Sequence, residues 1–303
     1  MLLLDKHADL SSNTAVGWAK RLFNAEKAGH TGTLDPFATG LLPICFGEAA
    51  KFSRFMLDAQ KAYRATLKLG QKSSTGDTEG EITETGKVDV DIARVKAILA
   101  KFEGTQTQIP PMHSALKRDG VPLYKLARQG LQVDRAPRDI NVLALSAFSL
   151  EGDELVIDTL VSKGTYIRVL AEDIGEALGC GAHLTALRRS ASGGFGLGQA
   201  VTLEALDRMA VGQRDAMLLP ADSLAMALPQ IRLDVAVSKA LQNGQTPRVA
   251  SFTFPPVDSA RYRAYDSNGA FLGVATASEC DANGATLTAL RLMTPTVAAA
   301  ENP

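Results

Sequence analysis

The sequence predicts an α/β protein of the α+β kind, followed by a small, mostly β domain at the C-terminus. Segments with the period of a strand and segments with the period of an amphipathic helix follow one another through the first two thirds of the chain. A hairpin pattern joins two long strands near the middle. After residue 229, spaced apolar residues are separated by turn signals, which is typical of a compact β domain. At 303 residues, the chain is long enough for both parts.

The first elements lead directly to the segment that carries the most chemistry. Leu2–Leu4 predicts a short strand, and the Ser-Ser-Asn run at 11–13 offers N-caps for a helix. Gly29 is expected to end this helix, and Leu41–Phe46 then predicts a buried strand. The helix has apolar residues spaced as one face requires, namely Ala15, Trp18, Ala19, Leu22 and Phe23.

Residues 30–40 (HTGTLDPFATG) predict a shaped loop that presents a single acid, Asp35. Pro36 disfavours helix at Asp35, while Gly32 and Gly40 permit backbone conformations and close approaches that larger residues would block. By itself, the segment favours an ordinary turn in which the aspartate bonds its own backbone. A catalytic acid is the alternative.

The middle of the chain alternates strands and helices. Residues 61–70 alternate as a half-exposed strand, and a hairpin through Gly152 joins Ile140–Leu150 to Glu154–Val161. Asp91 is a cap candidate for a helix whose expected inward residues are Ile92, Val95, Ile98, Leu99 and Phe102. A further helix begins near residue 167, with Ile167, Leu170, Ala171, Ile174 and Leu178 expected inward.

Several functional classes lack their sequence signatures. The cysteines (45, 180 and 280) stand singly and the four histidines are isolated, so we expect no metal site. Phosphate-loop, dinucleotide-binding and nucleophile-elbow motifs are absent, so we expect no cofactor. The apolar runs are too short to cross a membrane and no export signal precedes them, which favours the cytoplasm.

Charge is segregated although the net charge is only −1. Residues 51–72 carry six basic residues and one acidic residue, and residues 111–140 carry six basic and three acidic residues. This arrangement could form a basic face that binds a phosphate backbone. Chance clustering on a solvated surface is the alternative. The paired prolines at 110–111 and the basic residues after them also suggest an inserted, partly mobile element.

Four motifs, in order, resemble the TruB family of tRNA pseudouridine synthases of the bacterial type. They cover essentially residues 1–200. A weaker resemblance, at Leu241–Gln245, is to the start of a PUA-type RNA-binding domain. The four motifs are Leu3-Leu4-Asp5-Lys6, residues 29–40, Tyr63-Arg64 with Leu69-Gly70, and residues 162–168 with residues 181–189.

The resemblance implies a pseudouridine synthase fold, in which helices flank a mixed, mostly antiparallel sheet. It assigns residues 1–228 to the catalytic domain, about 108–139 to an RNA-clamping insertion, and 229–303 to a PUA-like RNA-binding domain. The family isomerises uridine 55 in the T loop of tRNA to pseudouridine without a cofactor or metal. We therefore expect tRNA, through its T-stem-loop, as the partner of a cytoplasmic monomer that needs neither a membrane nor an obligate protein partner.

The resemblance also assigns roles to individual residues. Asp35 matches the catalytic nucleophile, ionised at neutral pH by default, and Arg168 matches the arginine that pairs with it. Without the resemblance, the other matched positions would be interpreted as core, loop or structural residues. In the family, the flipped base stacks on the tyrosine that matches Tyr63, and the histidine that matches His30 fills the space that the base leaves. Tyr166 and Leu187 match residues that line the pocket. Lys6 is a weaker substrate-binding candidate.

Two other functions stay open at this stage. One is a guide-RNA-dependent pseudouridine synthase subunit of a ribonucleoprotein, whose core motifs are similar; the insertion around 110–138 favours the stand-alone type instead. The other is a catalytically silent protein that binds and remodels tRNA, which the presence of both Asp35 and Arg168 disfavours.

Overall fold

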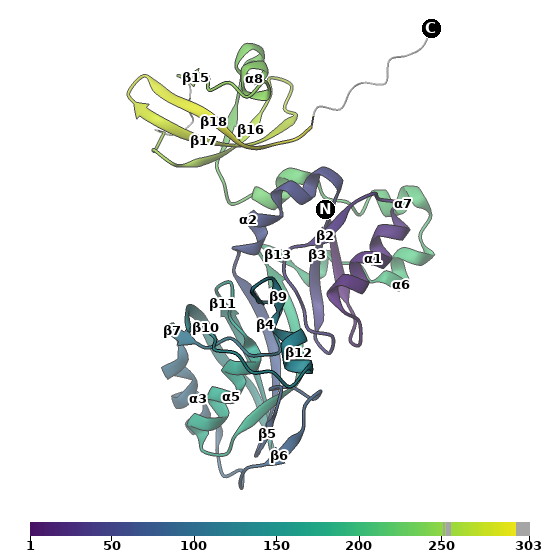
Figure 1. The fold of residues 1–303 in the computed structure, drawn as a ribbon, viewed down its shortest axis with the longest axis vertical. Coiled ribbons are helices and arrows are strands. Elements are labelled where there is room, and N and C mark those ends of the chain that lie inside the picture. The colour runs from purple at the N-terminus through teal and green to yellow at the C-terminus, as the bar shows by residue number, and fades with distance from the viewer. Residues whose placement is uncertain (251, 253–255, 295–303) are drawn as a thin grey trace.

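A computed structural model describes residues 1–250, 252 and 256–294, and two β-sheets organise them (Figure 1). A nine-stranded sheet occupies one end of the molecule in this view, and a five-stranded sheet occupies the other. The remaining strands form two separate two-stranded sheets. One pairs β5 (Gln71–Ser73) with β6 (Ile82–Glu84), and the other pairs β8 (Lys117–Arg118) with β9 (Val121–Pro122).

The nine-stranded sheet is mixed and mostly antiparallel, as predicted. The pairing of β3 with β12 is parallel, and the other paired strands of this sheet are antiparallel. Two strands lie off the main path, because β2 (Ala28–His30) pairs with β3 and β13 (Phe195–Gly196) pairs with β12. The others, in spatial order, are β1 (Leu2–Lys6), β3 (Thr39–Phe46), β12 (Ala182–Ser192), β4 (Lys61–Leu69), β11 (Glu154–Val161), β10 (Arg138–Glu151) and β7 (Gly104–Gln108).

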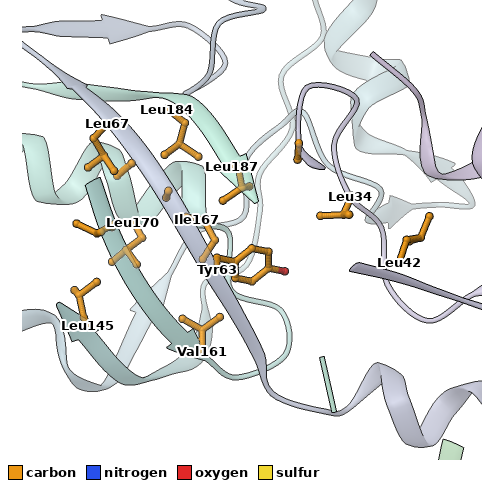
Figure 2. Packing of buried hydrophobic residues seen from close by; sticks show 14 of the residues in the cluster. Leu34, Leu42, Tyr63, Leu67, Leu145, Val161, Ile167, Leu170, Leu184 and Leu187 are labelled. Atoms are coloured by element: carbon orange, nitrogen blue, oxygen red, sulfur yellow. The ribbon is translucent and has the colours of Figure 1, made fainter. Parts of the chain in front are cut away.

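Helices bury one face of this sheet. Tyr63 and Leu67 alternate along β4 toward that face and pack with Leu170 of α5 (Figure 2). All five residues predicted inward on α5 are buried. The α-helices are α1 (Ser12–Leu22), α2 (Ser53–Leu57), α3 (Ile92–Leu99), α4 (Leu123–Arg128), α5 (Ile167–Leu178), α6 (Leu203–Arg208), α7 (Val211–Asp215) and α8 (Val235–Gln242), and the 3-10 helices are η1 (Gly47–Phe52), η2 (Ala100–Phe102), η3 (Leu197–Gln199) and η4 (Ala221–Ala225).

The predicted extent and face of α1 were wrong in part. The helix ends at Leu22 rather than at Gly29, which lies in β2, because Asn24 adopts a left-handed conformation (φ 45°) that ends the helix. Trp18 is exposed, since the stripe that faces the core includes Val16. The prediction for α3 was wrong at Ile92, which is exposed in the first turn.

The five-stranded sheet contacts the N-terminal part of the molecule through apolar residues of η1 and η4. Phe271 lies against Phe52 of η1, with ring centroids 5.2 Å apart, and Val274 packs in one cluster with Met1 and Leu224. The sheet consists, in spatial order, of β14 (Gln230–Arg232), β16 (Arg261–Tyr265), β17 (Phe271–Asp281), β18 (Gly284–Leu292) and β15 (Arg248–Val249).

Candidate active site

Asp35 and Arg168, 133 positions apart in the sequence, meet in the structure. Asp35 lies in the loop between β2 and β3, and Arg168 lies in the first turn of α5. Nε of Arg168 is 3.0 Å from Oδ2 of Asp35. The arginine side chain is only 4% exposed, whereas 34% of the aspartate side chain is accessible. A buried guanidinium therefore holds a carboxylate that an incoming molecule can reach.

The guanidinium of Arg168 also joins two other segments to this pair. Nη1 lies 3.4 Å from Oδ2 of buried Asp77 and donates to the Thr75 carbonyl at 2.9 Å. Nη2 donates to the His113 carbonyl at 2.7 Å. Because a guanidinium has a planar, fixed set of donors, these contacts fix the orientation of the group that faces Asp35.

Asp77 is a site residue that the sequence analysis missed. Gly76 (φ +77°) brings it close to α5, because a Cβ at Gly76 would lie 2.6 Å from Oε1 of Glu172 and 3.2 Å from Cβ of Arg168. Thr75 and the backbone of Glu79 donate to Oδ1 of Asp77 and fix its carboxylate. The only sequence signal was a glycine beside an acid in a short polar run.

The electrostatic environment of Asp35 differs from the default expectation for an exposed aspartate. Burial raises the pKa of Asp35, the charge of Arg168 opposes this rise, and the nearby Asp77 carboxylate adds to it. The pKa of the carboxyl group is therefore above its ordinary value, and the ion pair with Arg168 keeps the ionised form available.

A first cavity, of about 330 Å³, opens in front of this pair. Tyr63, Tyr166 and Leu187 line it, together with Asp35 and Arg168. Figure 2 shows Tyr63 and Leu187 close together on the two neighbouring strands β4 and β12. An aromatic face and an aliphatic side chain beside one charged pair suit a flat, mostly apolar ring that carries a few polar atoms.

A second cavity, of about 370 Å³, shares Asp35 and Arg168 with the first one. His30 lines this cavity and not the first one. Burial lowers the pKa of His30, and the charge of Arg189 adds to this effect, so the imidazole is neutral near pH 7. Residues 114–115, in the segment between β7 and β8, line both cavities.

The structure does not bring Lys6 to either cavity. Its side chain is fully buried, and Nζ donates to the carbonyls of His7 (2.9 Å), Leu10 (2.7 Å) and Pro36 (3.1 Å). Lys6 therefore supports the loop just after Asp35 and has no surface for a substrate.

Polar side chains hold the residues beside the reactive pair in place. Oγ of Ser12 both donates to the Leu34 carbonyl and accepts from the Leu34 N–H, each at 2.8 Å. Gln108 binds Tyr166 in the same two-point way, accepting from its N–H at 2.8 Å and donating to its carbonyl at 3.1 Å. Neither Ser12 nor Gln108 was predicted as a site residue, because each lies in a run of polar residues, at 11–14 and 105–108, in which nothing distinguishes one member from the others.

The described residues contain no group of three or more His, Cys, Asp or Glu side chains that could hold a metal ion. They also contain no helix that is both long and apolar enough to span a membrane.

Comparison with known proteins places this geometry in a family. The model of the TruB family pseudouridylate synthase N-terminal domain matches residues 20–167, and that of the tRNA pseudouridylate synthase B C-terminal domain matches residues 168–225. A protein of Burkholderia mallei (strain NCTC 10247), named tRNA pseudouridine synthase B, is 51% identical over 281 residues, which cover 92% of this chain and 93% of that protein. The chain belongs to the TruB family of pseudouridylate synthases. A Thiobacillus denitrificans relative with the same name is 51% identical over 279 residues, 91% of each chain.

A solved structure has a similar fold. A chain of the structure titled "Crystal Structure of a Cbf5-Nop10-Gar1 Complex" matches with a TM-score of 0.76 and 25% identity, covering 97% of this chain and 84% of that one. The two TruB family models meet between Ile167 and Arg168. This junction lies in the first turn of α5, and the nine-stranded sheet contains strands from both sides of it, because β12 follows it in the sequence and pairs with β4, which precedes it.

Proposed function

We propose that the protein is a tRNA pseudouridine synthase that isomerises uridine 55 in the T loop of tRNA. The observation that carries the proposal is the ion pair of Asp35 and Arg168 beside a cavity lined by Tyr63 and Leu187. Family membership and the names of the 51% identical relatives support tRNA as the substrate.

The reaction needs one nucleophile and room for a base to turn. The Asp35 carboxylate forms a bond to C1′ of the ribose as the glycosidic bond from C1′ to uracil N1 breaks. The detached uracil then turns within the cavity, and its C5 bonds to the same C1′ as the bond from C1′ to Asp35 breaks, which regenerates the carboxylate. N1 gains a proton and C5 loses one, so the product is an isomer of the substrate. Arg168 keeps the carboxylate charged and oriented before the attack.

Base flipping gives the surrounding residues their proposed roles. A uridine stacked in a folded loop must leave the stack to reach Asp35. Tyr63 stacks on the extruded base, a contact of about 1–3 kcal/mol, and Tyr166 and Leu187 close the pocket around it. His30, on the second cavity, is suited to fill the space that the base leaves in the loop.

The rest of the chain is proposed to hold the RNA. In this proposal, residues 1–228 form the catalytic domain, the insertion at about 108–139 clamps the T-stem-loop, and residues 229–303 form a PUA-like RNA-binding domain. The enzyme acts as a cytoplasmic monomer without an obligate protein partner.

Asp35→Asn tests the proposal. The variant should fold like the wild type, since amide and carboxylate have nearly the same shape, but should release no tritium from a T-stem-loop labelled at C5 of uridine. Wild-type release under the same conditions is the control. Turnover by Asp35→Asn would disprove the nucleophile assignment, and absence of wild-type turnover would favour a silent RNA-binding protein.

A guide-dependent enzyme is the second candidate, because the chain matches the structure titled "Crystal Structure of a Cbf5-Nop10-Gar1 Complex". Activity of the purified protein on naked tRNA transcript separates the two. Turnover without guide RNA supports the stand-alone enzyme, whereas turnover that requires added guide RNA and proteins supports the alternative.

A further inference from the structure

Two buried cations, Lys61 and Arg189, line the first cavity beside Asp35. Lys61 begins β4, and Arg189 lies on the neighbouring strand β12, where it pairs with Tyr63. Both side chains flank Gly32 of the Asp35 loop. A Cβ on Gly32 would lie 3.4 Å from Cε of Lys61 and 3.6 Å from Nη1 of Arg189.

Among the described residues, neither cation has a carboxylate within ion-pair distance. Lys61 donates to the carbonyls of Leu57 (3.2 Å) and Ala59 (2.8 Å), so one N–H of the ammonium group remains. Arg189 uses three of its five N–H groups, on the carbonyls of Leu41, Gly32 and Thr33.

The nearest acids already have other partners. Asp35 pairs with Arg168, and Asp58 pairs with Lys163 at 2.7 Å. Burial lowers the pKa of Lys61 to about 8, and the neighbouring charge of Arg189 is the next cause. Two like charges in a partly desolvated cavity wall repel each other. An anion from outside the protein would stabilise both charges.

We propose that Lys61 and Arg189 form a subsite for an RNA phosphate that flanks the target uridine. The proposal rests on the proposed function, because a nucleotide turned into this cavity carries a phosphodiester on each side. Uracil itself is neutral and cannot balance the two cations. The remaining N–H groups beside Gly32 are donors of the kind that bind phosphate oxygens.

The test combines a protein change with an RNA change. T-stem-loops are prepared with a neutral methylphosphonate at the phosphate on the 5′ or the 3′ side of the target uridine. Binding of wild type and Lys61→Met to each RNA is measured at several salt concentrations. Lys61→Met should weaken binding of unmodified RNA about tenfold and make the salt dependence shallower by about one phosphate contact.

The decisive result is the coupling between the two changes. One methylphosphonate should weaken wild-type binding about tenfold and should have little further effect on Lys61→Met. Lys68→Met, on the same strand but paired with Asp153 at 2.6 Å, is the matched control and should change binding less than twofold.

Independent effects of the two changes, or an unchanged affinity of Lys61→Met, would overturn the proposal. If Lys61→Met does not fold, the wild-type measurements decide, and equal affinity for all three RNAs refutes the subsite. Pseudouridine formation on unmodified RNA is measured separately, so failure of the proposed function and failure of the phosphate subsite can be distinguished.

Discussion

At the scale of single residues, the charge of Asp35 depends on two partners with opposite effects. Arg168 lowers the pKa of this carboxyl group and Asp77 raises it, on top of the rise that burial causes. Asp77 also helps to hold Arg168, from 3.4 Å. The same residue therefore orients the arginine and makes ionisation of Asp35 harder.

Asp77→Asn should separate these two effects. Removal of the like charge lowers the pKa of Asp35, so the acidic limb of kcat/KM against pH should move to lower pH. Loss of a charged partner of Arg168 should reduce kcat at neutral pH about tenfold. The measurement is turnover of a T-stem-loop between about pH 4.5 and 8. A limb that stays in place or moves to higher pH would contradict this account.

The matched control is Asp158→Asn. Asp158 pairs with Arg64 on the exposed face of the sheet, at 2.7 Å. This variant removes the same charge from the protein without touching Arg168, so the profile should not change.

The reactive pair could be predicted from the sequence, whereas Asp77 could not. Asp35 and Arg168 lie in motifs that resemble a known family, and the structure brings the two residues together. Asp77 lies near Glu79 and Glu81 in a polar run, and nothing in the sequence distinguishes the three acids. Its position follows from the close approach of Gly76 to α5, which is a property of the folded chain.

At the scale of elements, the same limit applies to the polar side chains that hold the site. The apolar periodicity predicted β4 and α5 correctly, because burial of one face determines both elements. Ser12 and Gln108 bind the backbone of Leu34 and Tyr166 from distant segments. Such contacts follow from the tertiary arrangement, so periodicity carries no information about them.

Gln108→Leu tests how much this support contributes. The change leaves the N–H of Tyr166 without its partner, at a cost of about 1–3 kcal/mol, whereas the Tyr166 carbonyl still accepts from the N–H of Leu170. We expect a lower Tm and a kcat/KM that falls more than tenfold, because Tyr166 lines the first cavity. Thermal unfolding and single-turnover kinetics measure the two effects.

Gln106→Leu is the control on the same strand. Gln106 donates to the carbonyl of Phe102 and does not contact Tyr166. If both variants lose activity equally, the loss comes from β7 as a whole and the specific role of Gln108 is wrong.

The parallel pairing of β3 with β12 depends on Gly40. This residue has φ +103°, and a Cβ would lie only 2.3 Å from the carbonyl oxygen of Arg189. Gly40→Ala should therefore lower the free energy of unfolding by more than about 3 kcal/mol, measured in urea. Gly29→Ala, where a Cβ meets nothing within 4 Å, should change it by less than about 1 kcal/mol. Equal stability of the two variants would show that β12 can move away without cost.

At the scale of the whole molecule, the sequence predicted a second, mostly β part but not the surface where it meets the first. Residues 219–229, which connect the two parts, contain η4, and Leu224 and Ala225 of this helix are buried. The shared apolar cluster joins Met1 to Val274, and no local pattern relates residues so far apart in the chain.

This shared cluster predicts that the two sheets unfold together. Phe271 of β17 contacts Phe52 of η1, and Phe52 is fully buried in the shared cluster. Phe271→Ala removes the ring and should cost about 2–4 kcal/mol at the contact, since the residue is only partly buried. The five-stranded sheet should then lose its coupling to the larger one, and calorimetry should resolve two transitions instead of one. Phe148→Ala, which removes a 61% exposed ring from β10, should leave a single transition. A single, shifted transition in Phe271→Ala would mean that the remaining cluster, which includes Val274, is sufficient to couple the two sheets.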